Sequence, residues 1–145
     1  MNIRPGATLG PWRHEVDPEP VRRMAHVLGD PNPIHLDPGA ARALRLGDNV
    51  VNQGPNNLAY IFNLLEETAP GAYVEELDVR LMASVVAGDT VEARGSVEEV
   101  LDGQIRCKVW LDVVPPEPAA SSGDSRRRRA LEGYAVIRLP NEARQ

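Results

Sequence analysis

The sequence predicts an α+β fold in which one antiparallel sheet curls around a long helix. Segments with the 3.6-residue period of helices occupy the chain up to about residue 67, and segments with the two-residue period of strands follow from residue 77. One helical segment is apolar around most of its circumference, which is typical of a helix wrapped by other structure. A block of helices followed by a block of strands is typical of α+β proteins.

The first predicted helix follows an N-terminal segment, residues 1–17, that looks irregular because glycine and proline interrupt it. Asp17 before Pro18 is a helix cap followed by proline at the first helical position. Gly29 ends the helix. Its apolar face has the spacing i, i+3, i+4, i+7, at Val21, Met24, Ala25 and Leu28.

Two more helices are predicted before the strands begin. Asp37 and Pro38 repeat the cap-plus-proline signal and open a short helix that reaches roughly Leu46. The long apolar segment NNLAYIFNLLEE, residues 56–67, follows Gly54-Pro55 and is the central helix. Pro70 and the glycine after it end this helix.

Alternating apolar and polar residues then predict an antiparallel meander of four strands. The turn Asp102-Gly103 is a strong hairpin signal between the second and third strands. In the third strand the inward residues are Ile105, Cys107, Val109, Leu111 and Val113. We expect a flexible loop at 115–129 and a single domain over residues 1–145. The predicted strands cover residues 77–85, 91–97, 105–113 and 131–139.

The composition limits the class of protein. The 145 residues carry a formal net charge of −5, with a pI of about 5.2, so no basic field indicates nucleic acid. The single cysteine, Cys107, excludes an intramolecular disulfide and suits a reducing compartment. No apolar run approaches the length of a membrane span, and the N-terminus has no apolar signal region. We therefore expect a soluble, cytoplasmic protein.

The stretch with the most chemical content is GDPNPIH, residues 29–35. An acid and an imidazole in one turn can serve as proton donor and acceptor, because their environments can set their protonation states apart. Pro31 and Pro33 fix two φ angles, so both groups are held with little entropy left to lose. Asn32 can hydrogen-bond the backbone within the turn. The alternative is a rigid surface turn whose acid and imidazole are merely exposed.

This stretch and the residues after it resemble the MaoC-like dehydratases, also called R-specific enoyl-CoA hydratases. The signature of that family is G-D-x-N-P-[LIV]-H, and residues 29–35 meet all its fixed positions. The segment VVAGDTVEARGSV, residues 85–97, is similar to the family's strand-turn-strand after the central helix. The resemblance covers roughly residues 15–115. It implies a hotdog fold and a homodimer or a larger assembly of such subunits.

The resemblance also implies a reaction. Water adds reversibly to the trans-2-enoyl thioester of coenzyme A or of an acyl-carrier protein, and the product is the (R)-3-hydroxyacyl thioester. Asp30 and His35 would bind the nucleophilic water and carry the proton transfers. No metal or redox cofactor is needed, because coenzyme A arrives as part of the substrate.

The negative charge that develops on the thioester oxygen needs a hydrogen-bond donor, and the resemblance places it at Gly54. Free N–H groups and the helix dipole favour negative charge at the start of a helix. The chain departs from the family here, since the family commonly has His-Gly where this chain has Gln53-Gly54-Pro55. Pro55 has no N–H, which leaves Gly54 and Asn56 as donors. We assign Asn32, Gln53 and Asn56 to substrate binding.

Two other functions fit the same sequence. Hotdog proteins include thioesterases, in which a carboxylate near the thioester directs hydrolysis. The segment VNQGPNNLAY, residues 51–60, looks somewhat like small MaoC-like subunits of heteromeric hydratases that act on steroid side-chain thioesters. Such a subunit would need a second chain to complete the acyl tunnel, which makes a hetero-oligomer an alternative to the homodimer.

The remaining polar residues have ordinary structural interpretations. Asp37 is expected to be a helix cap, and His14 and His26 are expected to be solvated. Cys107 should be a packed thiol, and these residues have no metal-ligand spacing. The run Arg126–Arg129 is either a solvated loop or a site for the phosphates of coenzyme A or of a carrier's prosthetic group.

Overall fold

The computed structural model describes residues 3–115 and 127–140 and confirms the α+β class. Its elements are β1 (Thr8–Glu15), α1 (Pro18–Leu28), the 3₁₀ helix η1 (Pro33–His35), α2 (Pro38–Ala43), α3 (Gly54–Thr68), β2 (Tyr73–Leu81), β3 (Thr90–Leu101), β4 (Gln104–Val114) and β5 (Arg128–Arg138). All the helices come before four of the five strands. Within these residues no helix is long and apolar enough to cross a membrane.

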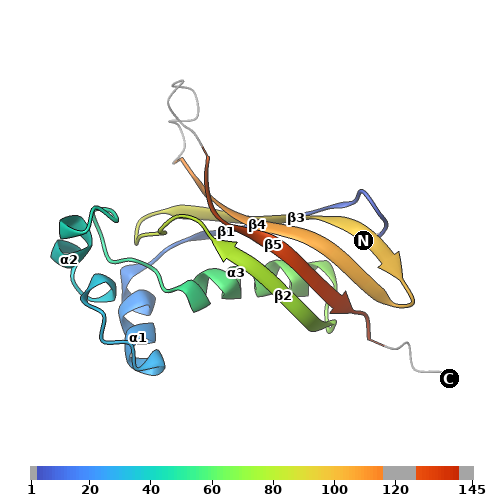
Figure 1. The fold of residues 1–145 in the computed structure, drawn as a ribbon, viewed down its shortest axis with the longest axis horizontal. Helices are drawn as coiled ribbons and strands as arrows, with labels where there is room; N and C mark the ends of the chain where they lie inside the picture. Colours follow the sequence, from blue (N-terminus) through green and yellow to red (C-terminus); the bar gives the residue numbers. More distant parts are fainter. Residues whose placement is uncertain (1–2, 116–126, 141–145) are drawn as a thin grey trace.

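The five strands form one antiparallel sheet in the order β1-β3-β4-β5-β2. β3, β4 and β5 are a meander, and φ is positive at Asp102 and Gly103, as the predicted hairpin turn requires. The predicted four-strand meander is wrong for β2, which pairs with β5 and not with β3. Figure 1 shows α3 along one face of the sheet, with α1 and α2 together at one end of the molecule.

α3 packs on the sheet through one face, which carries Asn57, Ile61, Leu64, Leu65 and Thr68. Ile61 and Leu64 join the inward residues of β3, β4 and β5 in a single apolar core. The opposite face is open: Ala59 is exposed and Phe62 is 44% exposed. The sheet therefore covers α3 from one side, and the other side of the helix is open in the single chain.

β1 lies where the sequence predicted irregular structure. It pairs with β3, and the register shifts between Leu9 and Trp12. Gly10 and Pro11, joined by a cis peptide bond, fall in this shift, so the missing N–H of proline removes no ladder hydrogen bond. A Cβ on Gly10 would lie 2.7 Å from the Ala93 carbonyl oxygen, so the strands approach closely here. The two residues that interrupt the period therefore sit in a bulge.

Two strand boundaries also differ from the prediction. β2 ends at Leu81, and Val85 is fully buried in the segment that follows. In β4 the register against β5 shifts between Leu111 and Asp112. This shift buries Val114 and leaves Val113, the predicted inward residue, only partly buried. The alternation in the sequence continues through both irregularities, so it does not reveal them.

The helix ends follow the caps in the sequence. The Oδ1 atoms of Asp17 and Asp37 each accept the backbone N–H two residues further on, both at 2.8 Å. Gly29 ends α1 in the left-handed conformation. α2 is shorter than predicted, since it ends at Ala43 and not near Leu46.

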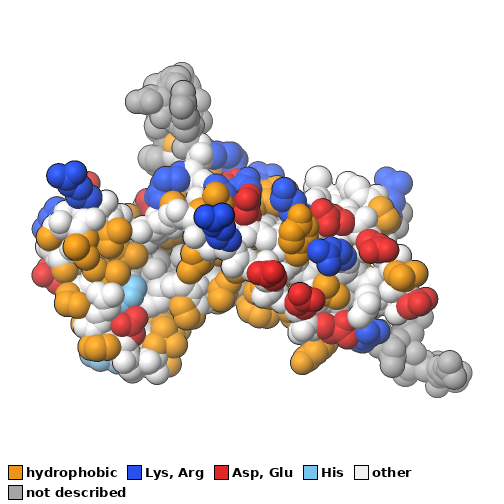
Figure 2. Space-filling view, in the orientation of Figure 1, with side chains coloured by type: hydrophobic (Ala, Val, Ile, Leu, Met, Phe, Trp, Pro, Cys, Tyr) orange, Lys and Arg blue, Asp and Glu red, His pale blue; other side chains and the backbone are white. Residues whose placement is uncertain are grey.

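The arginine run belongs to the sheet more than to a loop. Arg126 and residues 116–125 of the predicted loop lie outside the described residues, and β5 begins at Arg128. Ion pairs join Arg127 to Glu92 at 2.5 Å, Arg128 to Asp89 at 3.4 Å, and Arg129 to Asp112 at 2.5 Å and Glu132 at 2.8 Å. These three arginines are therefore bound to acids of the sheet and of the turn before β3. Figure 2 shows basic side chains gathered over the sheet with acidic ones between them.

Glu92 is the centre of the largest of these charge clusters. Its side chain is 1% exposed and meets Arg13 at 2.5 Å, Arg94 at 3.0 Å and Arg127 at 2.5 Å. Burial alone would raise the pKa of Glu92, but hydrogen bonds from Arg127, Arg13 and Arg94 lower it to about 2. One carboxylate thus connects β1, β3 and the start of β5.

We expect Glu92→Gln to lower the free energy of unfolding at neutral pH by about 2–3 kcal/mol. Because folding depresses the pKa of this carboxyl, its stabilisation is complete above pH 4.5 and is lost as the pH falls toward 2. The difference between wild type and variant should therefore shrink over that range, as measured by urea unfolding. Glu98→Gln, in a looser and more exposed pair at 3.7 Å, should change little. A difference that stays constant at acid pH would contradict this account.

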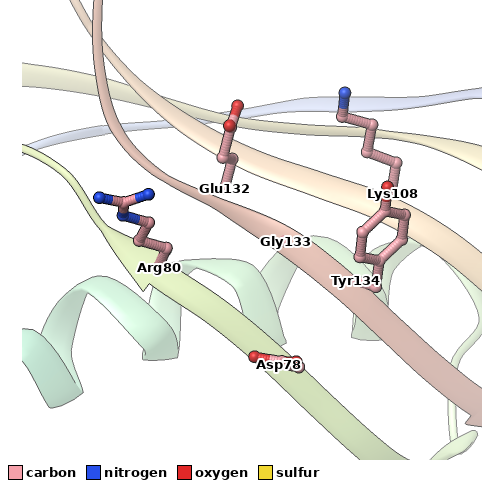
Figure 3. Close-up of a pocket in the computed structure, with 6 residues that line it drawn as sticks. All are labelled: Asp78, Arg80, Lys108, Glu132, Gly133 and Tyr134. Carbon is pink, nitrogen blue, oxygen red and sulfur yellow. The ribbon is translucent and has the colours of Figure 1, made fainter.

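A shallow pocket of about 250 Å³ opens on the face of the sheet away from α3. Figure 3 shows its lining: Asp78 and Arg80 of β2, Lys108 of β4, and Glu132, Gly133 and Tyr134 of β5. A Cβ on Gly133 would lie 1.9 Å from the Asp78 carbonyl oxygen. Glycine is therefore required for β2 and β5 to approach as closely as they do.

Candidate functional site

The turn between α1 and α2 brings Asp30 and His35 together. The Asp30 N–H donates to the Ala25 carbonyl at 2.9 Å, which fixes this residue to the end of α1. The Asn32 side-chain oxygen accepts the N–H of Ile34 at 3.3 Å and so caps η1, which ends at His35. As a result His35 Nε2 lies 3.2 Å from Asp30 Oδ2. The local turn chemistry therefore aims both groups at one point, as the motif predicts.

A second segment of the chain orients the imidazole. His35 is 7% exposed, and its Nδ1 lies 2.6 Å from the Val51 carbonyl oxygen. The Val51 N–H donates in return to the carbonyl of Ile34 at 2.8 Å. A carbonyl can only accept, so Nδ1 carries a proton, and Nε2 is the nitrogen that faces the acid. At this distance a proton on either group can form a hydrogen bond to the other, so the pair can act as a proton donor and acceptor in one unit.

The carboxyl group of the pair remains accessible. The Asp30 side chain is 38% exposed, and its Oδ1 accepts the N–H of Asn32 at 3.1 Å. The Val51 carbonyl thus fixes the His35 imidazole, while the Asp30 carboxylate is accessible to a reactant. This arrangement can take a proton from one bound molecule and give a proton to another.

Gly54 is the first residue of α3, and its N–H has no acceptor within the helix. The other predicted donor is engaged, because the N–H of Asn56 donates to the Gln53 carbonyl at 3.1 Å. Pro55 lies between them and has no N–H. Of the three positions, Gly54 is therefore the one whose amide points out of the first turn.

Gly54 lines a cleft of about 330 Å³ between the start of α3 and the residues that follow β2. The other lining residues are Val51, Asn52, Asn57, Leu81, Met82, Ala83 and Ser84. Asp30 and His35 do not line this cleft. Val51 connects the two features, since it lines the cleft and its carbonyl holds His35.

The three side chains assigned to substrate binding all have protein partners. Asn32 caps η1. Gln53 is 2% exposed, and its Nε2 donates to the Val21 carbonyl of α1 at 2.8 Å. Asn56 Nδ2 donates to Asn52 Oδ1 at 3.0 Å and to Gln53 Oε1 at 2.9 Å. The side chains of Gln53 and Asn56 thus bind other protein groups at the N-terminal end of α3.

This amide network includes residues that no motif in the sequence marks. Asn52 Nδ2 donates to Asn57 Oδ1 at 2.8 Å and to the Tyr60 hydroxyl at 3.2 Å. Burial raises the pKa of Tyr60, and the hydrogen bond from Asn52 partly offsets that effect. The ring centroid of Tyr60 lies 5.4 Å from that of Trp12 and 5.2 Å from that of His14. His14, which was expected to be solvated, is therefore half-buried against an aromatic ring. Four amides within six residues were the signal for this network.

The other candidates from the sequence lie outside the site. Asp37 is the cap of α2. Cys107 is a buried free thiol, as predicted, and burial raises its pKa to about 11. Over the described parts of the chain, no cluster of three or more histidine, cysteine, aspartate or glutamate residues is arranged to hold a metal ion.

Comparison with known proteins adds a family and a fold. The model of the MaoC-like domain family matches residues 4–113. Comparison with curated protein sequences gives no match. Among solved structures, the unliganded R-hydratase PhaJ1 from Pseudomonas aeruginosa superposes with a TM-score of 0.78 and 21% identity, over 97% of this chain and 84% of that one.

Two further structures have the same architecture. The (R)-hydratase of A. caviae involved in PHA biosynthesis gives a TM-score of 0.76 at 20% identity, over 97% of this chain and 99% of that one. A chain of the ChsH1-ChsH2 complex from Mycobacterium tuberculosis gives 0.74 at 21%, over 97% of this chain and all of that chain. These likenesses confirm the predicted hotdog fold.

Proposed function

Because this chain belongs to the MaoC-like domain family, we propose that it is a hydratase that adds water reversibly to a trans-2-enoyl thioester and forms the (R)-3-hydroxyacyl thioester. The observation that carries the proposal is the 3.2 Å contact between His35 Nε2 and Asp30 Oδ2, with the imidazole fixed on Val51. The fold shared with two R-hydratases supports it.

In the proposed reaction, one water molecule binds to both Asp30 and His35. The pair accepts a proton from this water while the water oxygen bonds to C3 of the enoyl group. The electrons of the double bond move toward the thioester carbonyl, and the pair gives one proton to C2. One proton is taken and one is given, so the contact between the two side chains lets the pair return to its starting state.

The Gly54 N–H would stabilise the negative charge on the thioester oxygen during this step. It is the helix-start amide that lines the cleft, and the positive end of the α3 dipole adds to its effect. The acyl chain would then lie in the cleft, between Asn57 and the apolar side chains of Leu81 and Met82.

The reaction transfers no electrons, so we propose that it needs no redox cofactor and that coenzyme A or a carrier protein enters with the acyl group. The buried free thiol of Cys107 supports a reducing compartment, and we place the activity in the cytoplasm.

The proposal is tested with crotonyl-CoA and with longer or bulkier enoyl-CoAs, by following the loss of enoyl absorbance. Reversible hydration to the (R)-3-hydroxyacyl product is the expected result. Release of free thiol from acyl-CoA, without hydration, would instead establish the thioesterase alternative. No turnover of any enoyl thioester by the purified protein and its assembly partners would contradict the proposal.

We also propose that the chain assembles through the free edge of β2. This strand ends the sheet, and unpaired strand edges favour pairing with another chain. Apolar side chains lie exposed beside it: Leu81 is 55%, Met82 51% and Phe62 44% exposed. A second copy on this edge would cover the open side of α3 and would close the cleft that Leu81 and Met82 line.

We expect the wild-type protein to elute as a homodimer or larger assembly and Leu81→Arg to shift it to the monomer, because a charge would be buried at the interface. Leu101→Arg, at an equally exposed site on the β3–β4 hairpin, should not change the elution volume. Light scattering coupled to size exclusion measures both. An unchanged assembly for Leu81→Arg would rule out this edge.

The hetero-oligomer is a second candidate, since one structural relative was solved as the ChsH1-ChsH2 complex. In that case the purified chain should be inactive alone and should hydrate enoyl thioesters only when it is mixed with a second MaoC-like chain.

A further inference from the structure

Gln53 connects three segments of the site through one buried carboxamide. Its Nε2 donates to the Val21 carbonyl in α1 at 2.8 Å, and its Oε1 accepts from Asn56 Nδ2 in α3 at 2.9 Å. Its backbone carbonyl accepts the N–H groups of Asn56 and Asn57 and so starts α3. The side chain is 2% exposed, so both of its polar ends depend on these protein partners.

The same segment holds the two groups of the proposed acid–base pair. Two residues before Gln53, the Val51 carbonyl orients His35. Through Val21, Gln53 is also tied to α1, the helix to whose end Asp30 is bonded. The residue after Gln53 is Gly54, the proposed oxyanion donor. Gln53 therefore connects α1, whose end binds Asp30, to α3, whose first residue is Gly54.

Removing the carboxamide should leave no buried group without a partner. The Val21 carbonyl also accepts the helical hydrogen bond from Ala25, by the i to i−4 geometry of α1. Asn56 Nδ2 keeps its hydrogen bond to Asn52 Oδ1. The usual cost of an orphaned donor or acceptor is therefore absent, and the fold depends little on this side chain. What would be lost is the fixed position of Gly54 relative to Asp30 and His35.

We propose that Gln53 is a positioning residue, which holds the Gly54 amide in register with Asp30 and His35 by bridging α1 and α3. This inference rests on the proposed hydratase function. Small misplacements of a reacting group are costly to a rate, since an error near 1 Å can reduce it by about 10²-fold.

The test uses Gln53→Leu and the similarly sized Gln53→Met, neither of which can donate to the Val21 carbonyl or replace the carboxamide's hydrogen bond with Asn56. In each, kcat for enoyl-CoA hydration should fall roughly 10- to 100-fold with KM little changed. Gln53→His offers one ring nitrogen as donor and the other as acceptor, and it should restore most of kcat. Thr68→Val, which removes a buried hydrogen bond at the other end of α3, should leave kcat unchanged.

A second readout does not need turnover. In ¹⁵N NMR spectra, Gln53→Leu should broaden the Gly54 amide signal, beyond the shift that any change of its neighbour causes, and should shift and broaden the His35 ring signals; Thr68→Val should do neither. Wild-type kcat in Gln53→Leu, or unchanged Gly54 and His35 signals, would overturn the positioning role. Absence of hydration by the wild type would overturn the proposed function, and the NMR comparison would still decide whether Gln53 positions Gly54.

Discussion

Asp30→Asn is expected to lower kcat for hydration of crotonyl-CoA by about 10²- to 10⁴-fold, because the amide cannot take a proton from the bound water. The fold should be unaffected, since the side chain is 38% exposed and an amide oxygen can still accept the Asn32 N–H. The loss of enoyl absorbance with time gives kcat, and urea unfolding gives the free energy of unfolding. Wild-type kcat in this variant would exclude the carboxylate from the mechanism.

The matched control is Asp37→Asn, a nearby exposed position with the same change of charge. Asp37 caps α2, and asparagine caps as well as aspartate, so both activity and stability should stay near wild type. For the other member of the pair we expect His35→Asn to reduce kcat over the same range. Asparagine can still donate to the Val51 carbonyl in place of Nδ1, but it lacks the atom that faces Asp30.

Gly133→Ala is expected to lower the free energy of unfolding by about 4 kcal/mol or more, or to prevent folding. The new methyl group would lie 1.9 Å from the Asp78 carbonyl oxygen and 2.6 Å from the Val79 Cα, both of them backbone atoms of β2. Relief requires β2 to move away from β5 and to break their ladder of hydrogen bonds. Chemical unfolding, or soluble yield if the variant does not fold, measures the effect.

Gly39→Ala provides the comparison. Its new methyl group would approach only the Asp37 carboxylate, at 3.2 Å, and alanine is favourable in a helix. This variant should be as stable as wild type within about 1 kcal/mol. If Gly133→Ala is equally stable, β2 separates from β5 more easily than their backbone contacts indicate.

The features that the sequence predicted correctly are those made by neighbouring residues. The caps at Asp17 and Asp37, the left-handed Gly29 and the Asp102-Gly103 hairpin depend on one turn of chain each. The approach of Asp30 to His35 has the same origin, because the prolines and Asn32 between them set the turn. The hydrophobic periodicity and the turn-forming residues were sufficient to predict these local features.

The features that the sequence did not predict depend on partners far along the chain. β1 was missed because its bulge contains the glycine and proline that hide its period, and its place is decided by pairing with β3. The position of β2 at the edge depends on β5, more than fifty residues later in the sequence. Arg127, Arg128 and Arg129 were placed in a loop because the acids they pair with, Glu92, Asp89 and Asp112, are far away in the sequence.

The amino-acid sequence by itself determined that an acid and an imidazole share one rigid turn, because the stiffness of prolines and the caps of helices act over a few bonds. Only the tertiary structure decided which distant groups hold that turn in place. The Val51 carbonyl binds the His35 imidazole, and the Gln53 carboxamide connects α1 to α3. Hydrogen bonds of this kind join segments 16 and 32 residues apart. They form only when packing brings the segments together, and no local preference of the chain encodes them.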